Sequence, residues 1–317
     1  MVKIISWNVN GLRTRILDHL DAKSFTTKTT IENESSLGEI ITQFDPDILC
    51  FQETRCAEDN LNKFQIEGYH KYHNSSQLEG ARAGNRYSGV AIWSKLKANN
   101  CITHLPTLEQ PNLEGRIIIL EFDHFILINT YQPNAGSNFI YRTTQWDPAM
   151  ISYLTTLKTK NIPIVWTGDL NIARTPRDLY IGSLEYKYKN HKNINDPEWR
   201  KKQLAKYWQT DPIRGMGERA LAGFTLEERI AFEKIIALGF ADTWRHLNPK
   251  ESFTGYTWWS FKIPKSHNKG WRIDYFVVTK EHIDKVKQFH IFTEKNCFET
   301  TGKRSSDHAP IGLEIDL

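Results

Sequence analysis

The residues of this sequence that could do chemistry are carboxylates and amides that directly follow apolar runs. The run IVWT ends in Gly168, Asp169, Leu170 and Asn171, and the run ILCFQ ends in Glu53. In extended geometry Asp169 and Asn171 share the face opposite Leu170, and we interpret Gly168 as the point where the backbone turns. That face would form the floor of a site. Asp and Asn after a strand are also common turn formers, so this run alone leaves both interpretations open.

Further polar side chains occupy similar places along the chain. Asn8 and Asn10 alternate with apolar residues near the N-terminus, Asp274 opens the run YFVV, and Asp307 and His308 precede the last apolar run. An adjacent Asp-His pair is usually polar surface, but a loop beside a buried strand is also where catalytic pairs are often found. Five titratable side chains are thus expected at strand ends: Glu53, Asp169, Asp274, Asp307 and His308.

The elements that must position these side chains follow from apolar periodicity. We expect strands at 3–10, 48–53, 87–93, 116–122, 125–131, 164–167, 272–278 and 311–315, and helices at 40–44, 145–158 and 225–239. The two-residue connection at 123–124 predicts a hairpin, and a loop at 132–136 would hold Tyr131 and Asn134 at the edge of the sheet. Alternating strands and helices together with a hairpin indicate an α/β chain with mixed sheets.

Composition sets limits on the class of protein. The chain has 317 residues, 39% of them hydrophobic, which is enough for one large domain or two small ones. No apolar segment is long enough for a signal peptide or a membrane span, so we expect an intracellular protein. Four cysteines without a Cys-x-x-Cys pair argue against a zinc ribbon or a disulfide framework. A net charge of +4 is compatible with an anionic partner but does not identify one.

Two polar segments look like insertions, at 23–36 and 180–218. The first is rich in Ser, Thr and charged residues, and the second in Lys, Arg, Tyr and Trp. The second is either a solvated surface segment or a nucleic-acid contact that combines phosphate-binding cations with stacking rings. Between 185 and 206, three acids (Glu185, Asp196, Glu198) face seven cations: Lys187, Lys189, Lys192, Arg200, Lys201, Lys202 and Lys206.

Seven motifs in this order resemble the exonuclease III family of apurinic/apyrimidinic (AP) endonucleases. They are 6–13 (SWNVNGLR), 49–54 (LCFQET), 87–90 (YSGV), 168–171 (GDLN), 222–229 (AGFTLEER), 270–276 (GWRIDYF) and 306–308 (SDH). The resemblance implies a single domain spanning 1–317, with a four-layer fold of two packed mixed β-sheets flanked by helices. It also implies a DNA repair enzyme that hydrolyses the phosphodiester 5′ to abasic sites in duplex DNA, with 3′-5′ exonuclease and 3′-phosphodiesterase activity.

The resemblance assigns roles to particular side chains. Asp169 would orient or deprotonate the attacking water with the help of Asn171, and His308, held by Asp274, would hydrogen-bond the scissile phosphate. Tyr131 and Asn134 would contact the phosphate as well, and Asn8, near the metal, would be a further catalytic residue. The metal would be Mg²⁺, with Mn²⁺ as a possible substitute, because the site offers hard oxygens and no thiols. Its implied ligands are Glu53, Asp307, Asn8, Asn10, Asp169 and Asn171. The implied DNA contacts are Arg13, Arg86, Tyr87, Asn134, Trp258, Trp271 and Ile273, of which the last three would form an apolar pocket for a flipped-out, base-free sugar.

The chain departs from the family pattern at two positions. Asn10 stands where some members have Asp, and Arg174 stands where many have His. Two other classes remain as alternatives. One is a phosphodiesterase of the same fold with another substrate, such as an inositol phosphatase, a sphingomyelinase or a poly(A) deadenylase. The other is a non-catalytic DNA-binding relative, which should have lost some of Glu53, Asp169, Asp274 or His308.

The resemblance also implies partners and a place of action. The partner would be double-stranded DNA with abasic or 3′-blocked sites, and we expect a monomer that does not bind membranes. The compartment would be the cytoplasm of a prokaryote or the nucleus of a eukaryote.

Overall fold

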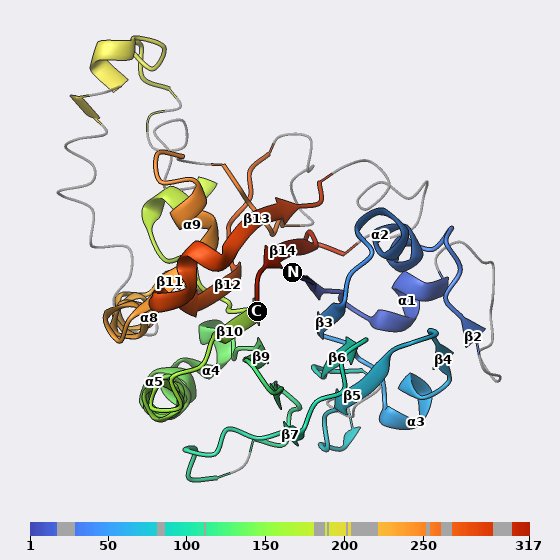
Figure 1. Ribbon diagram of the computed structural model, residues 1–317. Helices are drawn as coiled ribbons and strands as arrows, with labels where there is room; N and C mark the ends of the chain where they lie inside the picture. Colours follow the sequence, from blue (N-terminus) through green and yellow to red (C-terminus); the bar gives the residue numbers. More distant parts are fainter. Residues whose placement is uncertain are drawn as a thin grey trace.

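The computed structural model places two six-stranded β-sheets face to face, with helices on both outer faces (Figure 1). It describes residues 1–17, 29–80, 86–110, 112–180, 188, 190–200, 202–203, 221–251, 254–260, 268–293 and 306–317. Helices α1 and α2 cover one side of the pair of sheets, and α5 and α8 cover the other. The predicted four-layer α/β sandwich is confirmed.

The first sheet has the strand order β13-β14-β1-β3-β6-β5 and the second β11-β12-β10-β9-β8-β7. The strands of the first sheet are β13 (Val286–Ile291), β14 (Ile311–Ile315), β1 (Val2–Asn8), β3 (Ile48–Gln52), β6 (Val90–Ser94) and β5 (His70–Asn74). Those of the second are β11 (Phe240–Asp242), β12 (Asp274–Thr279), β10 (Ile164–Asp169), β9 (Ile126–Tyr131), β8 (Ile117–Glu121) and β7 (Asn100–Ile102). A short pair, β2 (Thr29–Thr30) and β4 (Phe64–Gln65), lies apart from both sheets.

The helices follow the same division into two halves. The described helices are α1 (Leu12–Leu17), α2 (Ser36–Phe44), α3 (Glu58–Leu61), α4 (Ala135–Tyr141), α5 (Asp147–Lys158), α8 (Leu226–Ala237) and α9 (Thr243–Leu247). A π-helix (Arg142–Trp146) joins α4 to α5, and 3₁₀ turns span Pro176–Asp178 and Lys280–Lys285. No helix within the described residues is long and apolar enough to cross a membrane.

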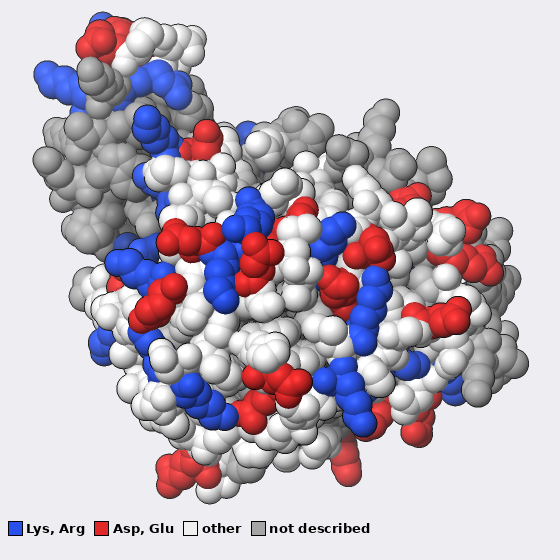
Figure 2. Space-filling model, viewed as in Figure 1, with Lys and Arg blue, Asp and Glu red and all other residues white. Residues whose placement is uncertain are grey.

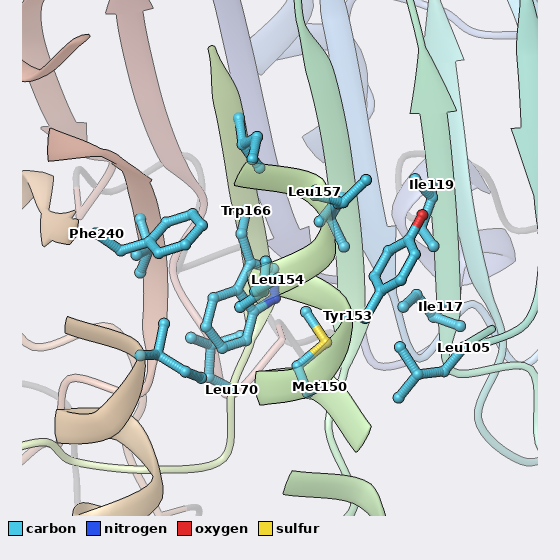
Figure 3. Packing of buried hydrophobic residues seen from close by; sticks show 14 of the residues in the cluster. Leu105, Ile117, Ile119, Met150, Tyr153, Leu154, Leu157, Trp166, Leu170 and Phe240 are labelled. Atoms are coloured by element: carbon cyan, nitrogen blue, oxygen red, sulfur yellow. The ribbon is translucent and has the colours of Figure 1, made fainter. Parts of the chain in front are cut away.

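Apolar side chains fill three layers of core. Between the sheets, Ile4 and Ile48 of the first sheet pack toward Val165 and Phe276 of the second. On the outer face of the second sheet, residues of α5 such as Leu154 cover Trp166 and Ile119 (Figure 3). Strands buried on both faces read as continuous apolar runs rather than alternating ones, which is the pattern seen in β3, β6 and β10.

Both sheets repeat one sequence of pairings: antiparallel, antiparallel, parallel, antiparallel, antiparallel. The single parallel pair is β1–β3 in one sheet and β9–β10 in the other. The C-terminal ends of these pairs carry Asn8, Glu53, Tyr131 and Asp169, and the antiparallel neighbours β14 and β12 begin beside them. The repeated pairing therefore brings six strand ends to one edge of the sandwich.

The structure corrects the prediction made for Gly168. This residue lies inside β10, paired with Thr130 of β9 and Tyr275 of β12, so the prediction that the backbone turns there is wrong. A Cβ at Gly168 would lie 1.9 Å from the carbonyl oxygen of Thr130, and its φ is +131°. The glycine allows close approach of β9, and the chain turns only after Asp169.

Other boundaries also differ from the prediction. The strand expected from Tyr87 begins at Val90, because Ser88 and Gly89 have positive φ angles of 49° and 87°. The predicted loop at 132–136 ends at Asn134, which caps α4. Strands β5, β7, β11 and β13 were not predicted; they lie at or beside the sheet edges, where the sequence is polar or the strand is short. The strand predicted at 3–10 ends at Asn8, because Asn10 has a positive φ of 46°, and the strand predicted from 272 begins at Asp274. The remaining predicted strands and helices are confirmed, including the β8–β9 hairpin.

The two predicted insertions are described only in part. In the first, 23–28 lie outside the described residues, Thr29–Thr30 form β2, and the buried Ser35 caps α2, so the end of this segment belongs to the fold. In the second, residues 180, 188, 190–200 and 202–203 are described. Tyr180 packs against the core, whereas Figure 1 shows the described residues between 188 and 203 (yellow) away from the sandwich, and Figure 2 shows Lys and Arg side chains there. The free cysteines Cys50, Cys56 and Cys101 agree with the expected absence of a disulfide framework, whereas Cys297 lies outside the described residues.

Candidate active site

A cavity of about 240 Å³ opens at the edge where the ends of the parallel pairs meet. Its lining combines carboxylates, amides, an imidazole, a phenol and an apolar side: Glu53, Tyr131, Asn134, Asp169, Asn171, Ala222, Gly223, Trp258, Trp271, Ile273, Asp307 and His308. Polar groups from both sheets and an apolar wall therefore share one cavity.

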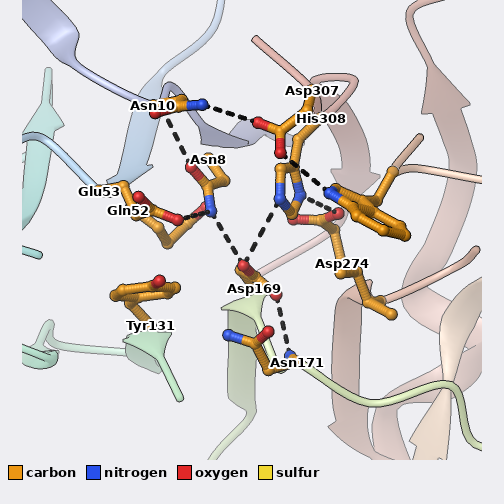
Figure 4. A network of polar contacts seen from close by, with 12 residues as sticks. Asn8, Asn10, Gln52, Glu53, Tyr131, Asp169, Asn171, Asp274, Asp307 and His308 are labelled. Atoms are coloured by element: carbon orange, nitrogen blue, oxygen red, sulfur yellow. Dashed lines mark hydrogen bonds and ion pairs between the residues drawn. The ribbon is translucent and has the colours of Figure 1, made fainter. Parts of the chain in front are cut away.

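Asn8 joins the two halves of the site. Its Nδ2 donates to Glu53 Oε1 at 3.1 Å and to Asp169 Oδ2 at 2.9 Å, while its Oδ1 accepts from the backbone N–H of Asn10 (Figure 4). Asn8 comes from the first sheet and Asp169 from the second. A single buried amide thus fixes the distance between the two carboxylates.

His308 lies between two aspartates. Its Nδ1 donates to Asp274 Oδ2 at 2.9 Å, and its Nε2 lies 3.7 Å from Asp169 Oδ2. All three side chains are buried. Asp274 therefore fixes the ring orientation, and Nε2 is directed toward the cavity and Asp169.

The protonation of this trio follows from burial and charge. Burial lowers the pKa of His308, but the carboxylates of Asp274 and Asp169 raise it more strongly, so the net pKa lies above its usual range. Burial raises the pKa of Asp169, and Asp274 adds to this effect while His308 opposes it. The trio therefore holds a proton on His308 next to a carboxylate that is more basic than usual.

Asn171 and Asn134 form a second amide pair on the cavity wall. The backbone N–H of Asn171 donates to Asp169 Oδ1 at 2.9 Å, and Asn134 Nδ2 donates to Asn171 Oδ1 at 3.0 Å. Asn171 has a positive φ of 49°, so it reaches the cavity through a tight turn rather than through continued extended strand. Asp169 and Asn171 do face the same site, as predicted, but by a different backbone path.

Arg142 supports this wall from behind. Its guanidinium, 1% exposed, donates to the carbonyls of Pro133, Leu170 and Asn171 at 2.9 to 3.0 Å. It also pairs with Glu228 at 3.1 Å, whose other oxygen accepts from Gly223 N–H at the cavity rim. Arg142 therefore connects two loops that line the cavity.

Tyr131 lies beside Glu53 on the other side of the cavity. Burial raises the pKa of Tyr131 well above its usual range, and Glu53 adds to this effect. The Arg116 guanidinium lies 4.8 Å from the centre of the Tyr131 ring, which fixes the ring orientation. Tyr131 therefore stays protonated and can donate a hydrogen bond into the cavity.

Two groups of side chains offer ligand atoms for a cation. Asp169, Asp274 and His308 bring ligand atoms within 4.8 Å of one another, but the Nδ1–H of His308 is already bonded to Asp274, which fits a shared proton better than a metal. Glu53 and Asp307 line the cavity and present only oxygens. Oε2 of Glu53 accepts from both Nε and Nη2 of Arg55, whereas Oε1 of Glu53 and each oxygen of Asp307 accept an N–H group from Asn8, Asn10 or Trp258. Carboxylate oxygens of this kind fit a hard divalent cation.

The amides predicted as metal ligands face these carboxylates with nitrogen. Asn10 Nδ2 donates to Asp307 Oδ1 at 2.9 Å, as Asn8 does to Glu53. In this arrangement both amides orient the carboxylates of Glu53 and Asp307, and metal ligation by any of the predicted residues stays a prediction.

The predicted DNA contacts divide into two groups. Asn134, Trp258, Trp271 and Ile273 line the cavity, whereas Arg13, Arg86 and Tyr87 do not. Tyr87 is bonded to Glu114 and Arg116 instead. Arg174, which departs from the family pattern, pairs with Glu233 of α8 at 2.7 Å and is not part of the cavity lining.

Sequence reasoning missed several residues that support the site. Arg142 and Glu228 form a buried ion pair between distant parts of the chain, for which the sequence holds no local signal. Arg116 pairs locally with Glu114, but its contact with the Tyr131 ring was not predicted. Thr257 is completely buried, and its hydroxyl accepts from the backbone N–H of Asp274. Gly223 did have a signal, because it lies in the AGFTLEER motif.

Comparison with known proteins gives consistent results. A model described as the endonuclease/exonuclease/phosphatase family matches residues 5–308. The chain is 34% identical over 321 residues to a DNA-(apurinic or apyrimidinic site) endonuclease of Dictyostelium discoideum, covering 100% of this chain and 71% of that protein. It is 31% identical over 319 residues to an exodeoxyribonuclease of Bacillus subtilis, covering 100% of both.

Solved structures share the fold. A 3'-5' exonuclease from Neisseria meningitidis superposes with a TM-score of 0.71 at 24% identity, covering 100% of both chains. An AP endonuclease from Archaeoglobus fulgidus gives a TM-score of 0.68 at 23% identity, again over 100% of both chains.

Proposed function

The chain belongs to the endonuclease/exonuclease/phosphatase family and is a nuclease of its AP endonuclease group, and we propose that it cleaves the phosphodiester 5′ to abasic sites in duplex DNA. The cut leaves a 3′-hydroxyl and a 5′ deoxyribose phosphate. The same centre would also remove 3′-terminal nucleotides and 3′-blocking groups.

One observation carries this proposal. The carboxylates and imidazole suited to phosphodiester hydrolysis share a cavity with Trp258, Trp271 and Ile273. A sugar without a base can leave the duplex at low cost, and an apolar recess next to the phosphate chemistry would receive it. The alternative is a phosphodiesterase of the same fold with another substrate, and the apolar wall of the cavity argues for DNA repair instead.

The reaction assigns a task to each polar group. Water attacks phosphorus, its proton passes to Asp169, the P–O3′ bond breaks, and the departing O3′ takes up a proton. Burial makes Asp169 more basic than an exposed aspartate, as a general base near neutral pH requires. His308, kept cationic by Asp274, donates from Nε2 to the phosphate. Tyr131 and Asn134, which also line the cavity, donate to the same group.

Glu53 and Asp307 are the residues that would hold Mg²⁺, with Mn²⁺ as a substitute. When bound, the cation would neutralise charge on the phosphate. Asn8 bonds both Glu53 and Asp169, so it fixes the distance between the proposed metal ligand and the proposed general base. The family consists of metal-dependent nucleases, and we propose Mg²⁺ as the ion used by this chain.

Arg13, Arg86 and Tyr87 would contact the DNA backbone outside the cavity. The basic part of 180–218 is a second candidate contact, through Lys192 and Lys202 among the described residues. We propose that the protein acts as a monomer, as the family resemblance implies.

A labelled duplex with one abasic analogue tests the proposal. With Mg²⁺, the strand should be cut once, immediately 5′ to the analogue, and the product should be extendable by a polymerase. An undamaged duplex of the same sequence, poly(A) RNA and inositol phosphates serve as comparison substrates. Cleavage that persists in excess chelator, or a preference for one of the comparison substrates, would contradict the proposal.

A further inference from the structure

The apolar wall of the cavity and the predicted metal ligand Asp307 are connected by one side chain. The indole Nε1–H of Trp258 donates to Asp307 Oδ2 at 3.0 Å. The other oxygen, Oδ1, accepts from Asn10 Nδ2 at 2.9 Å. Because each oxygen has its own donor, the plane of this carboxylate is fixed, and the remaining lone pair of each oxygen is free for a cation.

Backbone hydrogen bonds hold Trp258 in position for its contact with Asp307. Trp258 exchanges two hydrogen bonds with Trp271, at 2.8 and 2.9 Å, and the next residue, Trp259, donates to the carbonyl of Asp307 at 3.0 Å. Thr257 O accepts from the backbone N–H of Ala309 at 2.7 Å. Residues 257–259 thus lie between the segment carrying Trp271 and the segment carrying Asp307.

Residues 257–259 also hold Asp274, the partner of His308, in position. Thr257 Oγ1 accepts from the backbone N–H groups of Ile273 and Asp274, both at 3.1 Å. The Trp258 and Trp271 rings meet edge to face, with centroids 5.6 Å apart. The indole of Trp258 therefore has a fixed ring orientation before it bonds Asp307.

We propose that Trp258 is a positioning residue for Asp307, in addition to being a wall of the pocket, and that its N–H rather than its ring surface fulfils this role. Asn10, which follows β1 of the first sheet, donates to the other oxygen of the Asp307 carboxylate. This explains how the chain functions with a neutral amide at position 10: Asn10 donates to Asp307 instead of adding a second negative charge. The inference rests on the proposed function, since it takes Asp307 as a metal ligand.

The test compares two conservative variants. Trp258→Phe keeps an aromatic wall but removes the N–H, and Trp271→Phe changes the same wall without removing a donor to Asp307. Mn²⁺ affinity is measured on DNA-free protein by titration calorimetry or by the EPR signal of free Mn²⁺. Loss of a group that orients a metal ligand weakens metal binding by about 10- to 100-fold, so we expect at least a tenfold rise in Kd for Trp258→Phe. Trp271→Phe should stay within about twofold of wild type.

Kinetics give an independent readout. For Trp258→Phe, cleavage of the abasic duplex should be slow at low Mg²⁺ and recover toward wild type at saturating Mg²⁺. For Trp271→Phe, any defect should appear in KM for DNA and should not respond to Mg²⁺. Asn10→Ala, which removes the other donor, should repeat the metal defect and covers the case in which Trp258→Phe does not fold.

The outcomes separate the two proposals. Wild-type Mn²⁺ affinity in both Trp258→Phe and Asn10→Ala would overturn this inference and leave the proposed function intact. Tighter binding in Trp258→Phe would also overturn it, because the N–H would then be competing with the metal. A wild-type protein that binds no Mn²⁺ would refute the metal site itself and this role of Trp258 with it.

Discussion

The close approach of β9 to Gly168 makes replacement of this glycine by alanine unusually costly. The added methyl would lie 1.9 Å from the Thr130 carbonyl oxygen, whereas contacts shorter than 3.0 Å are essentially never seen for Cβ atoms. The neighbouring atom is backbone, so the two strands must separate. In addition, a φ of +131° is a conformation that alanine rarely adopts.

The size of the effect follows from three contributions. Backbone strain costs about 1–3 kcal/mol. Weakening of roughly two ladder hydrogen bonds costs about 1 kcal/mol each. Misfit in a filled core adds about 1–3 kcal/mol. Together, Gly168→Ala should lower the free energy of unfolding by about 5 kcal/mol, a large part of the stability of a typical domain.

Gly68→Ala is the matched control. Gly68 also has a positive φ, +77°, but a Cβ there would meet nothing within 4 Å. Only the backbone preference is lost, at about 1 kcal/mol. In urea titrations followed by tryptophan fluorescence, Gly168→Ala should move the midpoint down by about 1.5 M at an m-value of roughly 3 kcal/mol per M, and Gly68→Ala by a few tenths. Equal shifts for the two variants would refute the close approach of β9 and β10.

Two further predictions concern the proposed catalytic centre, and a third concerns His73 of β5. Asp169→Asn and His308→Asn should each reduce turnover by at least about a hundredfold while abasic-duplex affinity, measured by fluorescence anisotropy, survives; near wild-type turnover in both would show the assigned centre to be wrong. Glu53→Ala should lose activity at low Mg²⁺ and regain part of it at high Mg²⁺, because Asp169 remains in place; a defect independent of Mg²⁺ would contradict a ligand role. Burial lowers the pKa of His73 to about 4, so the unfolded chain binds a proton that the folded chain does not, and stability should fall by up to about 3 kcal/mol as pH drops from 6.5 to 4. His73→Phe should remove that part of the pH dependence in urea titrations, and an unchanged slope would refute the assignment.

The sequence was a good guide where a functional residue directly follows a buried strand. Glu53 and Asp169 end apolar runs, and each lies in the cavity as expected. The same reasoning failed for Gly168, because a glycine beside a polar residue looks like a turn while its true reason, the backbone of β9, lies 38 residues earlier. A local sequence pattern predicts the conformation of the local backbone, and it gives no information about the strand that packs against it.

Partnerships between distant side chains were beyond local reasoning. That Asp274 holds His308 came only from the family resemblance, since the two are 34 residues apart. The helix predicted to open at Thr225 is present, and Thr225 and Glu228 form a capping box at its start. However, the second task of its Glu228, pairing with Arg142 below the cavity, depends on how two halves of the chain dock. Such buried pairs leave no periodic trace in the sequence.

The pairing of β1 with β14 has a consequence for synthesis on the ribosome. Asn8 emerges early, but the strand that brings His308 beside it is formed by Ile311–Ile315 and pairs with Val2–Ser6. The two chain ends lie close together, with the N-terminal amine 3.7 Å from the carboxylate of Asp316 (Figure 1). Pairing across this sequence separation must wait until the last strand has left the exit tunnel. The site that contains Asn8 and His308 is therefore assembled only after Ile311–Ile315 have been synthesised.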